Sequence, residues 1–325
     1  MATYKGIQGY SVQTLSSDPS PTASVEGQLW YNSTSGIYKI AMSGSGAWAA
    51  GGNCNTAVYF PGNLGIQTAA MKFGGNPPGA PNTNASETYN GTAWTEGANL
   101  GTATYGNAGF GTTTAGVSAG GGHPVITTVQ TWNGTSWAAG TAINTGRYLV
   151  HGLGVQTAGI IVGGNAPDKD EVETYNGSAW TEIANLNTAR GSAALAGDST
   201  AALASGGGPG NGLGIVESYN GTSWSETTDL NSDRANPNGG GIANTAAVVF
   251  GGTSPPGQTV TGKTEKWNGT TWTETGDLGT ARALLGAGQS GPSSVNIAFT
   301  GGQPAVVATE EWNDPVYAIK TVTTS

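Results

Sequence analysis

Apolar and polar residues alternate in short runs along most of the chain, and turn residues separate these runs. In Glu173–Glu182 (ETYNGSAWTE) a Tyr and a Trp lie five residues apart, with Asn-Gly between them. Tyr and Trp favour strands, and Asn-Gly fits a tight type I′ turn in which both central residues take positive φ angles. The pattern therefore predicts a β-hairpin, and no stretch shows the 3.6-residue period of a helix.

This hairpin recurs along the chain together with two other markers. Further copies lie at Tyr89–Trp94, Trp132–Trp137, Tyr219–Trp224 and Trp267–Trp272. Gly pairs follow apolar or small runs and begin at Gly74, Gly121, Gly163, Gly207, Gly251 and Gly301. A tetrad opens each unit, and in four units it ends in Arg147, Arg190, Arg234 or Arg282. The Trp residues that end these hairpins, with Trp48 before them, follow one another at intervals of 43 to 48 positions, so the chain is built of repeats.

Each repeat contains four strand-like pieces. In the third repeat these are residues 147–153, 158–163, 171–176 and 179–183. Four strands in a repeat of roughly 40 to 50 residues are typical of a β-propeller blade. The Gly pairs predict an all-β, six-bladed propeller over residues 46–325, with small residues near the axis and the bulky Tyr and Trp on outer strands.

A Gly pair, then an aromatic residue, then a Trp in a four-stranded unit resembles the kelch repeat. The resemblance covers about residues 46–320, and it departs from the family in its five-residue aromatic-to-Trp spacing and its short, Gly-rich loops. It implies a kelch-like propeller. Such propellers include binding platforms, enzymes and structural modules, so the resemblance implies no single function.

The ends of the repeat region predict how the ring closes. Trp312 takes the place of the outer aromatic in the last repeat, but no Trp follows it at the usual spacing. Trp48 stands alone before the first Gly pair, so its strand is one candidate to complete the last blade. The alternative is residues 316–320, in which Tyr317 lies five residues after Trp312. We favour Trp48 because Asp314-Pro315 is suited to end the preceding strand.

Residues 1–45 do not follow the repeat and form a separate predicted segment. Residues 28–40 predict a hairpin, which alone would be marginal in water, so we expect it to pack on the main body, a partner or a larger assembly. Glu26–Gly36 (EGQLWYNSTSG) resembles a short element of tailed-bacteriophage structural proteins, often near the start of fibre or appendage proteins. The resemblance implies a virion protein, made in the host cytoplasm, whose residues 1–45 contact other virion proteins in a homo-oligomeric particle component.

Composition and charge narrow the class of partner. A net charge of −9 without a basic run argues against nucleic acid. The single Cys54 excludes an internal disulfide framework, and no apolar stretch reaches membrane-spanning length. The N-terminus lacks a signal-peptide pattern, so we expect a soluble chain.

The four repeat arginines occupy a position that lies near one rim of a propeller channel. One interpretation of Arg147, Arg190, Arg234 and Arg282 is an anion- or sugar-binding rim. The interpretation that we favour is that each Arg pairs with a carboxylate of a neighbouring repeat, which would fix register more than add stability. Candidate carboxylates stand two residues before the outer aromatic, at Glu87, Glu173, Glu217, Glu265 and Glu310, with Gln130 in the remaining blade.

Other candidate chemistry is sparse. Asp168, Asp170 and Glu171 are a candidate calcium site, although they lack the Gly and ligand spacing of a known calcium loop. Only two histidines occur, His123 and His151, and no nucleophile motif or phosphate loop is found, so we expect no enzyme, no cofactor and no resident metal. The acids that follow each Trp by two residues are expected to form a solvated edge: Glu96, Glu182, Glu226 and Glu274.

These features predict a binding module: a virion tail fibre, appendage or capsid-associated protein whose propeller contacts a host-surface glycan or protein. The alternative is a purely structural decoration protein without a ligand. The longest loops join second and third strands and therefore fall on one face, the candidate partner surface. They are Pro- and Gly-rich rather than aromatic, and comprise residues 76–86, 165–170, 207–214 and 253–262.

Overall fold

The computed structural model describes residues 12–20, 25, 27–43, 46–122, 124–165, 167–208, 212–255, 258–314 and 317–322. Strands and turns make up these residues, and no α-helix occurs among them. The chain forms two compact units. One is Ala47–Asn313, and the other combines Met1–Gly46 with Asp314–Ser325.

Within its described residues, Ala47–Asn313 forms six four-stranded antiparallel sheets, the blades. Blade 1 contains β5 (Gly62–Ile66), β6 (Ala69–Phe73), β7 (Ser86–Tyr89) and β8 (Trp94–Glu96). Blade 2 contains β9 (Ala108–Thr112), β10 (Ala115–Ala119), β11 (Val129–Trp132) and β12 (Trp137–Gly140). Blade 3 contains β13 (His151–Val155), β14 (Ala158–Val162), β15 (Val172–Tyr175) and β16 (Trp180–Glu182).

The remaining blades follow the same order, with one change in the last. Blade 4 contains β17 (Ala194–Gly197), β18 (Ala202–Ser205), β19 (Val216–Tyr219) and β20 (Trp224–Glu226). Blade 5 contains β21 (Asn238–Ala243), β22 (Ala246–Phe250), β25 (Thr264–Trp267) and β26 (Trp272–Glu274), with a small hairpin of β23 (Thr253–Ser254) and β24 (Thr259–Val260). Blade 6 contains β27 (Gly286–Ala287), β28 (Val295–Phe299), β29 (Thr309–Asn313) and β4 (Ala47–Ala50).

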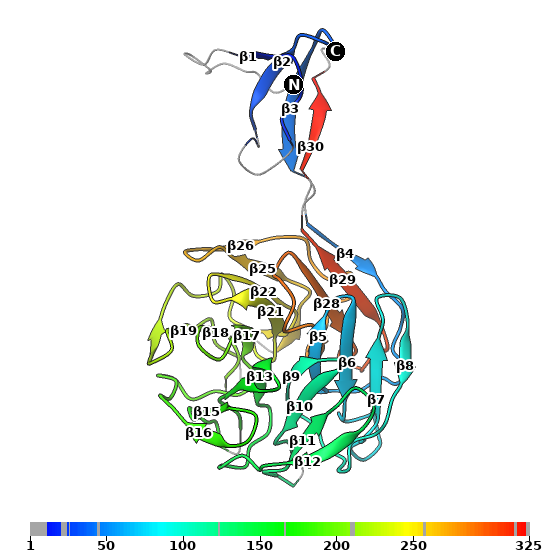
Figure 1. Cartoon of the computed structure of the whole chain (residues 1–325), viewed down its shortest axis with the longest axis vertical. Helices are drawn as coiled ribbons and strands as arrows, with labels where there is room; N and C mark the ends of the chain where they lie inside the picture. Colours follow the sequence, from blue (N-terminus) through cyan, green and yellow to red (C-terminus); the bar gives the residue numbers. More distant parts are fainter. Residues whose placement is uncertain are drawn as a thin grey trace. The chain divides into compact units, whose positions relative to one another are not determined.

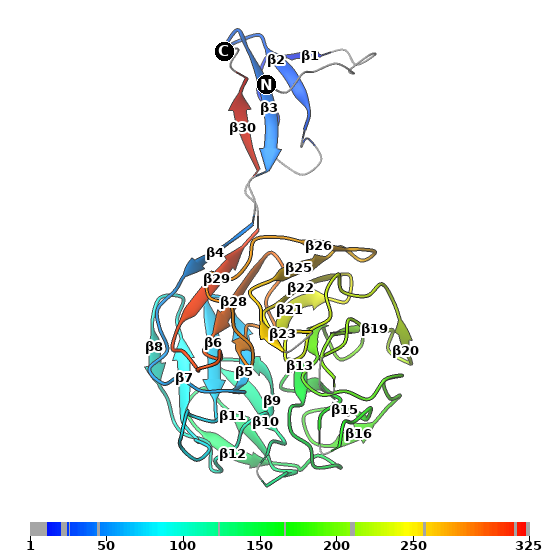
Figure 2. The same cartoon turned by 180° about the vertical axis from the view of Figure 1, so that it is seen from behind.

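The first strands of the blades form a closed ring around an axis. Contacts run from β5 through β9, β13, β17 and β21 to β27, which contacts β5 again. Figures 1 and 2 show the blades arranged around this ring. Small residues are required there: a Cβ on Gly109 would lie 2.2 Å from the Asn63 carbonyl oxygen of blade 1. The predicted all-β, six-bladed propeller is confirmed.

Outer aromatic residues fill the space between blades. The Trp94 ring of blade 1 lies 4.8 Å from the Phe299 ring of blade 6, and Trp180 of blade 3 lies 6.1 Å from Phe110 of blade 2. Each outer Trp thus packs on the preceding blade, where the sheets diverge from the axis. Burying rings of this size supplies much of the apolar area that stabilises the fold.

The ring closes between the ends of the propeller sequence. β4 pairs with β29 and places Trp48 opposite Trp312, with ring centroids 5.6 Å apart. Trp48 Nε1 also donates to Thr264 Oγ1 of blade 5 at 2.9 Å. The N-terminal strand therefore completes the last blade, and residues 317–321 do not.

The hairpin turns differ from the type I′ turn that the sequence predicts. Tyr175 pairs with Trp180, so four residues lie between the paired positions, and of these only Gly177 takes a positive φ, 90°. Asn176 Oδ1 accepts hydrogen bonds from the backbone N–H groups of Ser178 and Ala179, each at 2.9 Å. The Asn side chain closes the loop, as Asn commonly does in turns, so a second positive φ is unnecessary.

The terminal unit is a four-stranded sheet in the order β1 (Gln13–Leu15), β2 (Leu29–Asn32), β3 (Ile37–Ser43) and β30 (Tyr317–Thr321). β1 is parallel to β2, and the other pairs are antiparallel. The C-terminal residues from Asp314 onward, which the sequence assigned to the propeller, group with this unit instead. Because β4 occupies the outer edge of blade 6, β30 has no place there.

Candidate functional site

The four repeat arginines are at most 1% exposed and are not available to form a binding rim. Arg147 Nη2 lies 2.6 Å from Glu173 Oε1, and Arg282 Nη2 lies 2.6 Å from Glu310 Oε1. The other two make the same kind of pair, Arg190 with Glu217 and Arg234 with Glu265. Each partner belongs to the same repeat, which corrects the predicted pairing with a neighbouring one.

The two blades without this Arg avoid an unpaired buried carboxylate in different ways. In blade 1, Val58 takes the Arg position, and Lys72 Nζ lies 2.5 Å from Glu87 Oε1. In blade 2, Thr104 takes it, and Gln130 replaces the carboxylate and accepts from the Gly101 N–H at 2.6 Å. An unpaired buried charge is costly, so the carboxylate stands only where a buried cation accompanies it. These buried pairs and their neutral replacement in blade 2 therefore stabilise the blades and do not form a binding site.

Aromatic residues gather on the face where second and third strands are joined. The residue after the Arg position forms a backbone bridge to the segment after the second strand, in the pairs Tyr59–Asn76, Tyr105–Gly122 and Tyr148–Asn165. The Tyr105 ring lies 5.6 Å from Tyr148 and 6.0 Å from Phe60. We call Tyr59, Phe60, Tyr105 and Tyr148, all half-buried, the aromatic patch.

The aromatic patch borders an open pocket of about 580 Å³. Rings, one aliphatic side chain and three amides line it: Tyr59, Phe60, Asn76, Asn82, Tyr105, Leu284 and Gln303. Asn76 Nδ2 donates to Asn82 Oδ1 at 3.0 Å, and Asn82 Nδ2 donates to the Gly122 carbonyl at 3.2 Å, which fixes both amides. Among the described residues, the lining includes no charged side chain. Rings beside fixed amides suit a neutral ligand with an apolar face and several polar groups.

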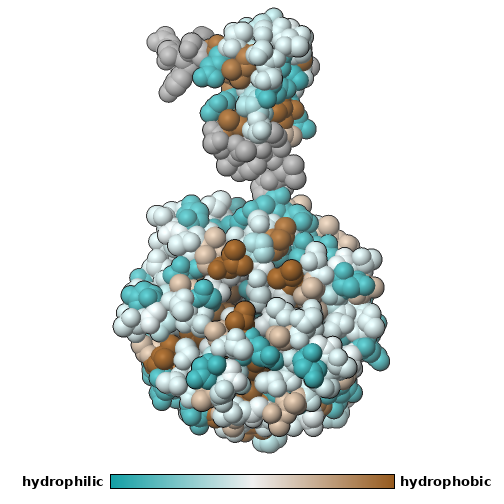
Figure 3. Space-filling model, in the orientation of Figure 1, coloured by the Kyte–Doolittle hydropathy of each residue, from teal (hydrophilic) through white to brown (hydrophobic). Residues whose placement is uncertain are grey.

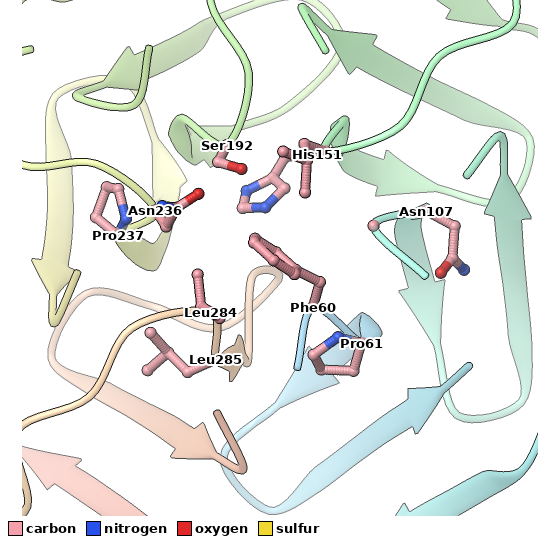
Figure 4. A pocket seen from close by; sticks show the side chains of 11 residues that line it. Phe60, Pro61, Asn107, His151, Ser192, Asn236, Pro237, Leu284 and Leu285 are labelled. Atoms are coloured by element: carbon pink, nitrogen blue, oxygen red, sulfur yellow. The ribbon is translucent and has the colours of Figure 1, made fainter. Parts of the chain in front are cut away.

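A second, much smaller cavity of about 10 Å³ lies at the axis, just before the first strands begin (Figure 4). One residue of each blade reaches it with φ between 47° and 61°: Phe60, Gly106, Leu149, Ser192, Asn236 and Leu284. Because this left-handed conformation recurs in every blade, it belongs to the blade turn. Burial lowers the pKa of His151, which also lines the cavity, to about 4, so the ring is neutral at pH 7.

Farther along the axis, a segment of blade 6 crosses between the other blades. Ser290 N donates to the Gly65 carbonyl at 3.0 Å, and Ser290 Oγ donates to the Gly111 carbonyl at 3.3 Å. The Gln289 amide lies 2.8 Å from the Gly152 carbonyl oxygen and donates to it when its nitrogen faces that oxygen. Blade 6 thus ties the inner strands of blades 1, 2 and 3 together across the axis.

The structure does not assemble the other predicted site. Lys169 Nζ lies 3.3 Å from Glu171 Oε1, and burial raises the pKa of Asp168. Among the described residues, no three His, Cys, Asp or Glu side chains are placed to hold a metal ion, so Asp168, Asp170 and Glu171 are not brought together as a calcium site. His123 lies outside the described residues. The acids after each Trp are exposed on the outer strands, as expected.

The propeller face seen in Figure 3 is mostly polar or of intermediate hydropathy, with hydrophobic residues in small separate spots. No helix among the described residues is long and apolar enough to cross a membrane. No protein-family model matches the chain, and no curated protein sequence matches it. The kelch resemblance therefore rests on the repeat residues and the four-stranded antiparallel blades alone.

The aromatic patch is not among the sites predicted from the sequence. The long loops, which the sequence indicated as the partner surface, are not aromatic, whereas the tyrosines of the patch directly follow the tetrads that precede the first strands. A signal was present, since Tyr59, Tyr105 and Tyr148 directly follow the Arg position in three successive repeats. Gly191, Ala235 and Ala283 take that position in the other three, so the patch lies on one side of the axis.

Proposed function

We propose that the propeller is a binding module for a neutral carbohydrate, which contacts the aromatic patch and the adjoining pocket. The observation that carries this proposal is the pocket lining, in which rings of blades 1 and 2 stand beside amides held by hydrogen bonds. A sugar ring offers an apolar C–H face to an aromatic ring and hydroxyl groups to amides. The described lining residues are uncharged, which favours a neutral sugar over an anionic one.

The long loops that were predicted from the sequence to form a partner surface lie on the same face. The loops of blades 1 and 3 begin at Asn76 and Asn165, which bridge to Tyr59 and Tyr148. A purely structural decoration protein would need no pocket of rings and fixed amides. This supports ligand recognition over decoration alone.

We assign this module to a virion appendage of a tailed bacteriophage, with a host-surface glycan as ligand. The support is the resemblance of Glu26–Gly36, whose described residues form β2, the turn after it and the region just before it. In this proposal the terminal unit is the attachment part of the protein, and copies of it associate in the particle.

The terminal sheet supports association because one of its faces is apolar and is left exposed by the residues that the structure describes. Strand alternation and the pairing of Leu29 with Ile40 place Leu29, Tyr38 and Met42 on that face. Tyr38 and Met42 are 50% and 49% exposed, whereas Trp30 on the opposite face is 2% exposed. So small a unit with one covered face buries little apolar area, and association would add to it.

For the glycan proposal, we expect Tyr105→Ala to weaken binding about fivefold to thirtyfold, since a stacked ring contributes about 1 to 2 kcal/mol. The measurement is a glycan-array screen of the full chain, followed by calorimetric titration with the strongest neutral glycan. Tyr105→Phe is the matched control, because it keeps the ring and should keep most of the affinity. The proposal fails if the chain binds no neutral glycan, or if Tyr105→Ala binds like the unchanged chain.

For the attachment proposal, we expect Tyr38→Asp to shift the full chain toward monomer, because a charge at this position opposes burial of the apolar face. Sedimentation velocity over a hundredfold range of concentration measures the change. Ile242→Asp, at a 62% exposed position on the propeller, is the control and should leave association unchanged. A chain that is already monomeric at every concentration would refute association through this face.

A further inference from the structure

The axial cavity contains two polar atoms whose hydrogen bonding is incomplete. Ser192 is 5% exposed, and its Oγ has no partner in the described structure. His151 Nδ1 is also buried without a partner. Both residues line the cavity, and Figure 4 shows the Ser192 hydroxyl beside the His151 ring. Buried polar groups in proteins are nearly always satisfied, so this pair calls for a ligand.

The chemistry of the two atoms defines what that ligand must offer. Burial lowers the pKa of His151, so the ring is neutral, and Nδ1 is its buried nitrogen without a partner. When a neutral imidazole carries its proton on Nε2, its Nδ1 is an acceptor with a free lone pair. A serine hydroxyl both donates and accepts. The complementary group donates one hydrogen to Nδ1 and offers a lone pair to Ser192, which a carboxylate cannot do.

We propose that the axial cavity is a hydroxyl subsite, in which one O–H group donates to His151 Nδ1 and accepts a hydrogen bond from Ser192 Oγ. The volume of about 10 Å³ admits a single water-sized group. Phe60 and Leu284 line both this cavity and the pocket beside the aromatic patch, so the two are adjacent. A water molecule fills the subsite in the free protein, and a hydroxyl of the bound sugar displaces it. Only the second step rests on the proposed function.

The test is ¹⁵N-histidine NMR of the full chain, with the two histidines assigned through His151→Phe. We expect His151 to be the Nε2–H tautomer, with an Nδ1 resonance typical of a hydrogen-bond acceptor. Ser192→Ala should move that resonance toward the free lone-pair position, and Ser290→Ala, elsewhere on the axis, should not. An Nδ1 resonance at the free position in the unchanged chain overturns the subsite.

The sugar step is tested by adding the neutral glycan that binds in the array. We expect the Nδ1 resonance to shift on binding and Ser192→Ala to weaken the affinity about fivefold to tenfold, with Ser290→Ala unchanged. If the glycan binds on the aromatic patch but neither effect occurs, the sugar step is wrong and water alone occupies the subsite. If no glycan binds while Nδ1 still accepts a hydrogen bond, the proposed function fails and the subsite stands.

Discussion

Arg147→Met is expected to lower the free energy of unfolding by about 3 to 5 kcal/mol. Arg147 Nη2 is the buried cation beside Glu173, which is 1% exposed, and Nη1 donates to the Glu171 carbonyl at 2.7 Å. Without the guanidinium, the Glu173 charge remains buried and loses its strongest partner. Urea unfolding of the full chain, followed by Trp fluorescence, measures the difference.

Blade 2 shows which second substitution should restore the stability that Arg147→Met loses. There Thr104 and Gln130 stand where blade 3 has Arg147 and Glu173, so the fold accepts a neutral pair. Adding Glu173→Gln to Arg147→Met should therefore restore more than half of the lost stability. The reverse change, Gln130→Glu in blade 2, should destabilise because it adds a buried charge without a cation. If Arg147→Met costs under about 1 kcal/mol, or Glu173→Gln restores nothing, charge balance does not explain the repeat.

The blade architecture was predictable because its signals are local and repeated. Each hairpin is contained in about ten residues, and the Gly pairs and Trp residues mark the same points of every blade. The seam, where β4 pairs with β29 and closes the ring, was predictable for the opposite reason, since Trp48 and Trp312 are the two positions where the repeat is incomplete. Repetition turned a weak signal at one position into a strong one.

Features that depend on side-chain capping or on distant pairing were not predictable from these patterns. Asn-Gly is compatible with a two-residue turn and with the four-residue loop that the structure has, and only the bonds of Asn176 Oδ1 decide between them. Alternation identifies residues 317–321 as a strand but does not say which sheet it joins. Its partner, β3, lies more than 270 positions earlier in the sequence.

The site was only partly predictable, because its residues are far apart in sequence and contribute from different blades. The position of the arginines and the type of their partners followed from the repeat. The burial of the arginines, which excludes a binding role, could not be predicted from the repeat. It depends on how the strands of one blade pack over the side chain. The aromatic patch occupies three repeats of six, so a search for features common to all repeats passes over it.

At the seam, Trp312→Ala is expected to lower the free energy of unfolding by about 3 to 5 kcal/mol. Trp312 is 0% exposed, and its ring lies against Trp48 on a strand that no short loop connects to it. Its truncation removes apolar contact and leaves a cavity at the point where the ring is closed. Urea unfolding of the full chain measures the loss, and Trp48→Ala, at a half-buried ring, should cost less.

Trp267→Ala, at the position of Trp312 in blade 5, is the matched control within a continuous blade. The Trp267–Trp272 pair is joined by a four-residue loop, so β26 stays beside β25 after the ring is lost. β4 has no such link to β29, and its hydrogen bonds depend on packing between the two Trp rings. We therefore expect Trp312→Ala, but not Trp267→Ala, to speed amide hydrogen exchange along the outer strand of its own blade. Equal exchange at β4 and β26 in the two variants would show that the seam is no weaker than an ordinary hairpin.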